Sequence, residues 1–157
     1  SRHVDYIVAR ANKRIFAICQ LVRCGFDHND IVTVYCSLIR PVLEYASQVW
    51  HSGLTKTQSD EIERVQRSCL HIIYPQLSYS DARAVSGLQL LSVRRENAVI
   101  KLFNEIKNPS HVLHYLLPMK PSRNGSVTRD KYPFELKCGK TSRRTHSMIY
   151  YCIGKRI

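Results

Sequence analysis

Apolar side chains recur at steps of three and four positions through most of residues 1–118, the spacing of one face of an α-helix. This pattern predicts substantial helices over 4–22, 31–49, 56–74 and 93–106, and short ones over 80–86 and 111–117. No part of 1–118 alternates apolar and polar residues as a half-buried strand does. The expected fold class is all-α, a small helical bundle of about four main helices with a basic, irregular C-terminal tail.

Signals at the helix ends support these boundaries. Gly25 and Gly87 follow predicted helices and can take the left-handed conformation that ends a helix. Asp27, Asn29 or Asp30 can cap the second helix, and Ser92 can cap the helix over 93–106. The run Thr55-Lys-Thr-Gln58 has the form of a capping box.

Proline at position 41 interrupts the second predicted helix. It has no amide hydrogen, and its ring presses on the carbonyl four residues earlier, so the helix is expected to kink or restart there. The apolar pattern continues on both sides of Pro41, which favours a kink over a loop. Trp50 ends the run.

Charge is distributed unevenly along the 157 residues, which carry a net charge of +12. Residues 1–118 contain 14 basic and 10 acidic side chains, a net of +4, whereas 119–157 contain 10 basic and 2 acidic, a net of +8. We therefore expect a helical domain over 1–118 and a basic tail over 119–157 that is partly disordered or contains short β segments, around 132–136 and 147–153. A segment of this charge attracts polyanions, although it is also compatible with a solvated tail.

Metal and cofactor chemistry has little support in the sequence. The six cysteines form no C-x-x-C pair, and a zinc site from Cys138, His146 and Cys152 would lack both a recognisable spacing and a fourth ligand. The densest acidic cluster, over 60–63, suits the beginning of a helix better than a metal site. The sequence contains no local signature of a catalytic site. We expect the chain to bind no cofactor and no metal.

No apolar run has the length needed to cross a bilayer, and no signal-peptide pattern begins the chain. We expect no membrane association and an intracellular location, cytoplasmic or nuclear. The chain begins at Ser1 without a methionine, and the apolar spacing of a helix is present from Val4 onward. We therefore expect it to be a fragment of a longer protein.

Binding to nucleic acid is the function that the basic residues favour. Lysine and arginine residues on one face of amphipathic helices can bind along a phosphate backbone irrespective of its sequence. In the tail, cationic and hydroxyl-bearing residues precede Tyr150-Tyr151, a pair on which bases could stack. Taken singly, most of the basic residues on the helices are better explained as ordinary solvent-facing positions, some of them paired with Glu61, Glu63 or Glu96. The predicted phosphate contacts are Lys13, Arg14, Arg94, Arg95, Lys140, Arg143 and Arg144.

Several blocks of the chain resemble, in order, the region after the catalytic palm in reverse transcriptases of non-LTR retrotransposons, the LINE and jockey-like elements. The most specific block is Val34-Tyr-Cys-Ser-Leu-Ile-Arg-Pro-Val-Leu-Glu-Tyr-Ala46, followed by Val49-Trp-His51. The others are His3-Val-Asp-Tyr-Ile7 with Ala11-Asn-Lys-Arg14, Ile62-Glu-Arg-Val-Gln-Arg67 with Ile72-Ile73, Gly87-Leu88, Leu90–Arg95, Cys138-Gly-Lys-Thr-Ser-Arg143 and Ser147-Met-Ile-Tyr-Tyr-Cys152.

This resemblance implies a thumb and post-thumb region that grips the template–primer duplex beside the palm. The implied partners are RNA or an RNA–DNA hybrid, held by its phosphate backbone, and the palm domain of the parent RNA-directed DNA polymerase. The family's catalytic aspartates have no counterpart here, because they would lie before Ser1. The chain is therefore not expected to be an enzyme on its own.

Three alternatives remain open from the sequence. One is a helical protein-interaction module without a nucleic-acid role, which predicts a large exposed apolar patch around Trp50 and Tyr45. Another is a decayed copy of a mobile element, without function. The third is an enzyme with an unrecognised site, which requires a pocket with converging titratable groups.

Overall fold

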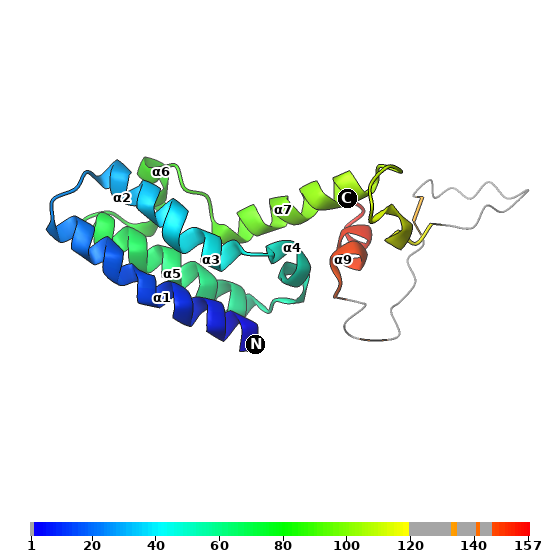
Figure 1. Ribbon diagram of the computed structural model, residues 1–157, viewed down its shortest axis with the longest axis horizontal. Coiled ribbons are helices and arrows are strands. Elements are labelled where there is room, and N and C mark those ends of the chain that lie inside the picture. Colours follow the sequence, from blue (N-terminus) through cyan, green and yellow to red (C-terminus); the bar gives the residue numbers. More distant parts are fainter. Residues whose placement is uncertain (1, 120–132, 135–140, 142–145) are drawn as a thin grey trace, which may run out of the picture. The chain divides into compact units, whose positions relative to one another are not determined.

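The computed structural model describes residues 2–119, 133–134, 141 and 146–157 (Figure 1). Within these ranges the secondary structure is helical apart from one isolated antiparallel bridge between Met119 and Phe134, which confirms the all-α class. The chain divides into two compact units. The first unit comprises 1–46 and 54–95, and the second comprises 47–53 and 96–157. The predicted boundary at 118 remains a prediction.

Helix α1 opens the first unit and spans Arg2–Arg23, in agreement with the helix predicted over 4–22. Its buried residues are spaced three, four and seven apart and form its inner face: Val4, Ile7, Ala11 and Ile18. Gly25 follows in the left-handed conformation with a φ of 75°. A residue without a Cβ adopts this conformation without steric strain, so the chain turns there.

The second predicted helix is divided into three segments: α2 (His28–Val34), a π-helical turn η1 (Tyr35–Ile39) and α3 (Arg40–Glu44). Asp27 caps α2 by accepting a hydrogen bond from the Asn29 amide. The Arg40 amide donates to the Tyr35 carbonyl, five residues back, which is the π pattern. Pro41 follows directly and lacks a donor, so the wider turn accommodates the proline without ending the helix.

The prediction that this helix continues to Val49 is wrong. It ends at Glu44, and Ala46 adopts a left-handed φ of 51° that breaks the winding. The next segments, α4 (Ser47–Trp50) and the 3-10 turn η2 (His51–Gly53), belong to the second unit. The apolar spacing alone could not reveal this break, because Ala46 and Val49 keep the helical rhythm although both are exposed.

Helix α5 spans Lys56–Ile73 and begins at the predicted capping box. The Thr55 hydroxyl accepts from the Gln58 amide at 3.2 Å, and the Gln58 side chain accepts from the Thr55 amide at 3.1 Å. Helix α6 (Tyr79–Ser86) follows and ends at Gly87, which has a φ of 66°. Both helix ends confirm the sequence prediction.

The core of the first unit lies where α1, α5 and the α2–α3 segment meet. Figure 1 shows α2 and α3 returning along α1, whereas α5 runs in the same direction as α1. Fully buried side chains from all of these elements fill the space between them: Ala11, Ile18, Ile31, Tyr35, Ile39, Leu43, Ile62, Cys69, Leu70 and Ile73. Burial of this apolar surface is the main driving force for the packing.

Helix α7 spans Leu91–Ile106, so Ser92 lies within its first turn and is not its cap. The first five residues of α7 belong to the first unit and the rest to the second. In its opening turn Val93 is 42% exposed, whereas Arg95, predicted to contact phosphate, is fully buried.

The second unit is built around the remainder of α7. Its buried cluster comprises Val99, Phe103, Ile106, Leu117, Phe134, Cys152 and Ile153. The helix predicted over 111–117 is wrong, since only a 3-10 turn η3 (His114–Leu116) forms there. The β-like run over 147–153 is also wrong, because helix α9 (Met148–Gly154) occupies it. No helix in the described ranges has the length and apolarity needed to cross a membrane.

Candidate nucleic-acid interface

Of the seven predicted phosphate contacts, four lie in the described part of the chain, and their environments differ. Lys13 is exposed on α1, as predicted, whereas the neighbouring Arg14 is half-buried. One guanidinium nitrogen of Arg14 donates to the Leu38 carbonyl, at 2.5 Å, and so connects α1 with the π turn. Arg14 therefore has a structural contact in addition to any solvent-facing role. The other three predictions, Lys140, Arg143 and Arg144, lie outside the described residues.

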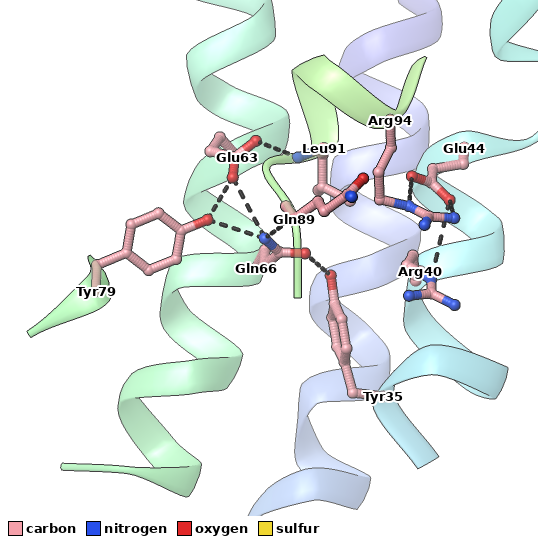
Figure 2. Close-up of polar contacts among 9 residues, drawn as sticks. All are labelled: Tyr35, Arg40, Glu44, Glu63, Gln66, Tyr79, Gln89, Leu91 and Arg94. Carbon is pink, nitrogen blue, oxygen red and sulfur yellow. Dashed lines mark hydrogen bonds and ion pairs between the residues drawn. The ribbon is translucent and has the colours of Figure 1, made fainter. Parts of the chain in front are cut away.

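Arg94 forms a two-pronged ion pair with Glu44. Its Nε lies 2.8 Å from Glu44 Oε1 and its Nη2 lies 3.2 Å from Oε2 (Figure 2). Arg40 adds a longer contact, 3.9 Å from Nε to Glu44 Oε2. The hydrogen bonds with Glu44 raise the pKa of Arg94. Because Glu44 neutralises this cation in a bidentate pair, Arg94 attracts phosphate less than an unpaired arginine would.

Arg95 corrects the prediction most clearly, because its side chain has no exposed surface. Its Nη2 donates to the Ser59 hydroxyl on α5 at 2.9 Å. Burial lowers the pKa of the guanidinium, an effect opposed by Glu63 and Glu44. A side chain in this position holds helices together and cannot reach a phosphate outside the unit, so Arg95 is withdrawn as a nucleic-acid contact.

Figure 2 also shows a polar network centred on the buried side chains of Glu63 and Gln66. Gln66 accepts from the Tyr35 hydroxyl at 2.8 Å and donates to the Tyr79 hydroxyl at 3.0 Å and the Gln89 carbonyl at 3.1 Å. The Glu63 carboxylate accepts from Tyr79 and from the Leu91 amide. Burial raises the pKa of both tyrosines, so they remain protonated donors. The network satisfies the buried polar groups of Glu63 and Gln66.

Within the described residues, no group of three or more histidine, cysteine or acidic side chains is arranged to hold a metal ion. The suggested zinc ligands cannot be assessed together because Cys138 lies outside the described part. Cys152 is buried in the second unit, and burial raises the pKa of its thiol to about 11. A protonated, enclosed thiol behaves as a small apolar side chain.

The outer face of α1 contains residues that the sequence prediction missed. Arg2, Tyr6, Arg10 and Lys13 are all exposed and are spaced four, four and three apart, so they form a continuous line along one side of the helix. We call this line the α1 basic stripe. Phe16, 67% exposed, follows within the next turn. The helix as a whole contains five basic residues against one acidic residue, Asp5.

A groove of about 440 Å³ borders the α1 basic stripe within the first unit. The side chains that line it come from the first three turns of α1 and from the chain at the end of α3: His3, Tyr6, Ile7, Arg10, Pro41, Val42 and Tyr45. Its two tyrosines are strongly exposed, Tyr6 at 60% and Tyr45 at 77%. The groove therefore combines apolar and aromatic walls with the cationic side chain of Arg10.

A second hollow, about 830 Å³, lies along α7 in the second unit. It is lined mainly by polar side chains, including Asn97, Asn104 and Asn108, and its one lysine, Lys101, is balanced by Glu105. The charges of Lys101 and Glu105 offset each other, and no phenylalanine, tyrosine or tryptophan among the described residues lines this hollow. The groove beside α1 is the better candidate for binding a polyanion.

Comparison of the chain with known proteins found no similar protein. No model of a protein family, no curated protein and no solved structure matches the chain. The resemblance to retrotransposon reverse transcriptases therefore remains an expectation from the sequence.

Proposed function

We propose that the chain is a noncatalytic part of a retroelement RNA-directed DNA polymerase that helps to hold the template–primer. In this proposal it binds the phosphate backbone of RNA or an RNA–DNA hybrid, and it functions beside the palm domain of the parent polymerase. The observation that carries the proposal is the α1 basic stripe, where Arg2, Arg10 and Lys13 are exposed on one side of a helix. Cations in such a line attract a backbone irrespective of its sequence.

The charge of the whole chain supports the same proposal. Its net charge of +12 raises the local concentration of any polyanion and speeds encounter. The basic tail adds Lys140, Arg143 and Arg144, which remain predicted contacts because they lie outside the described residues. In the first unit the principal proposed contacts are Arg2 and Arg10, together with Lys13. Arg95 is no longer proposed as a contact, and Arg14 and Arg94 are proposed only as weaker ones.

Binding of a fluorescently labelled RNA–DNA hybrid, followed by anisotropy at about 50 and about 200 mM salt, tests the proposal. We expect the affinity to fall steeply with salt. Arg10→Ala with Lys13→Ala should weaken binding and reduce the slope of log K against log salt by roughly 1.5 to 2, because two phosphate contacts are lost. Replacement of Lys56 and Lys101 by alanine is the matched control, since both lysines are exposed and lie outside the stripe.

Two results would count against the proposal. One is no binding of the hybrid at low salt by a chain whose helical circular dichroism is intact. The other is an equal loss of affinity in both double variants, which would mean that net charge alone determines binding. Primer extension by the isolated chain, with Mg²⁺ and a template, is expected to give no product.

A further inference from the structure

The groove beside the α1 basic stripe has aromatic surface that the backbone-binding role does not use. Tyr6 projects from α1 and Tyr45 follows α3, and both lie at the same groove with most of their surface exposed. Pro41 and Val42 add apolar surface to the lining of the groove. An aromatic ring with an apolar neighbour is the surface on which a flat, conjugated ring system stacks.

Cationic side chains lie at or beside the same groove. Arg10 lines it, and Arg2 and Lys13 lie on the same side of α1, before Tyr6 and after Arg10. Each step of four residues advances about 6 Å along a helix, so Arg2 and Arg10 lie about one turn before and after Tyr6. A ring with a cation on each side is suited to a ligand in which rings and anions alternate.

Carboxylates are absent from the described residues that line this groove. Asp5, on the same helix, lines a different hollow together with Glu61 and Arg64. Glu44, which precedes Tyr45, is paired with Arg94 at 2.8 Å. The groove therefore presents positive charge beside aromatic surface, without a nearby unpaired acid to repel an anionic ligand.

We propose that this groove binds unpaired bases of a single-stranded nucleic acid. Bases stack on Tyr6 and Tyr45, and the phosphates between them meet Arg10 and the rest of the α1 basic stripe. In a duplex each base face is already covered by its neighbours, so only a strand with unpaired bases can use the aromatic surface. This inference rests on the proposed function and specifies its ligand: the unpaired part of a strand, in addition to the duplex backbone.

The test compares two labelled strands with the same number of phosphates, oligothymidine and an abasic strand, on the full chain at low salt. Oligothymidine is expected to bind about tenfold more tightly than the abasic strand, because only it can stack. Tyr6→Ala and Tyr45→Ala should each weaken oligothymidine binding about tenfold and leave abasic binding unchanged. Tyr6→Phe and Tyr45→Phe should retain affinity because they keep the ring.

Tyr115→Ala is the matched control, since Tyr115 is as exposed as Tyr45, 77%, but lies in the second unit. It should change neither affinity. A strand with 5-iodouracil provides a second readout that does not depend on a variant folding. After irradiation, the crosslinked peptides are expected to contain Tyr6 or Tyr45.

The outcomes separate this inference from the proposed function. Equal affinity for the two strands, unaffected by the tyrosine variants, would overturn the inference, whereas salt-dependent hybrid binding would still support the proposed function. Loss of abasic binding in the alanine variants would also overturn it, as would crosslinks confined to other tyrosines. If a well-folded chain bound neither of the two strands nor the hybrid, both this inference and the proposed function would be wrong.

Discussion

The Glu63 carboxylate lies 3.0 Å from the backbone nitrogen of Leu91, 28 positions later in the chain, and accepts its hydrogen bond. Leu91 is the first residue of α7, where helical amides have no partner within the helix. A side chain of α5 thus caps the beginning of α7. The other carboxylate oxygen accepts from Tyr79 and Gln66, so three groups donate to one buried acid. This arrangement places the start of α7 against α5.

Glu63→Gln should destabilise the first unit by about 2 kcal/mol, because an amide cannot accept from three donors and has no charge to strengthen these hydrogen bonds. Urea unfolding followed by circular dichroism measures the change. Glu61→Gln is the control, since Glu61 lies two residues earlier on the same helix and is partly exposed. A loss as small as that of the control would contradict a capping role.

Arg94 and Arg95 are neighbours that should respond differently to replacement. Arg95→Ala is expected to lower the free energy of unfolding by about 3 kcal/mol, because it removes a fully buried side chain that bonds Ser59. Arg94→Ala should cost less than about 1 kcal/mol, because the Arg94 side chain is 36% exposed to water that screens its pair. Chemical denaturation distinguishes the two, and equal losses would show that the burial of Arg95 is not energetically important.

Ala46→Gly should stabilise the protein by about 1 kcal/mol, because Ala46 has a φ of 51° and glycine adopts that conformation without strain. The same substitution at Ala9, exposed within α1, should destabilise by about 1 kcal/mol, because glycine lowers helix propensity. Thermal unfolding of the two variants gives shifts of opposite sign if the break at Ala46 is correct. Two losses would mean that the helix continues through this position.

Alkaline pH should destabilise the chain. Burial raises the pKa of Cys69 to about 12 and that of Cys152 to about 11, and it also raises those of Tyr35 and Tyr79. These groups remain protonated in the fold while the unfolded chain releases protons. Stability is therefore complete below the unfolded pKa, about 8.5 for a thiol, and is lost as pH rises toward the folded value.

Between pH of about 8 and about 10, each buried thiol should reduce the free energy of unfolding by roughly 2 kcal/mol. Unfolding in urea at the two pH values measures this. Cys69→Ala should lose less over that interval than the natural chain does, because one of the titrating thiols is absent. Cys24→Ala is the control, because Cys24 is exposed. A stability that does not depend on pH over this interval would contradict the buried, protonated state.

The parts of the fold that sequence reasoning predicted are those determined locally. The helices α1 and α5 have long regular apolar stripes, and the capping box at Thr55 and the turn at Gly87 involve residues adjacent in the sequence. The burial of Arg95 depends instead on Ser59, 36 positions away, so no local rule reveals it. The run over 147–153 is rich in strand-forming residues, but packing of Cys152 and Ile153 against α7 prevails over that preference.

The candidate site was predicted only in part. Lys13 was identified because it lies in a basic pair, whereas Arg2 and Arg10 are isolated cations whose alignment appears only when the helix is wound. Tyr6 is not among the predicted contacts, and its groove also needs Tyr45, which lies directly before the break at Ala46 that the apolar pattern does not show. Counting charges in sequence windows favours clusters and overlooks residues spaced four apart.

The π turn at Tyr35–Ile39 makes this element one residue longer than a regular helix with the same buried face. Ile31, Tyr35, Ile39 and Leu43 are buried at strict steps of four, whereas regular winding alternates steps of four and three. Deleting the exposed Ser37 together with Pro41→Ala would restore that alternation. The segment should therefore tolerate this shortening, whereas removal of one residue from the middle of α5 would rotate its buried face away from the core. Homologous chains of unequal length would be expected to differ here by a single codon.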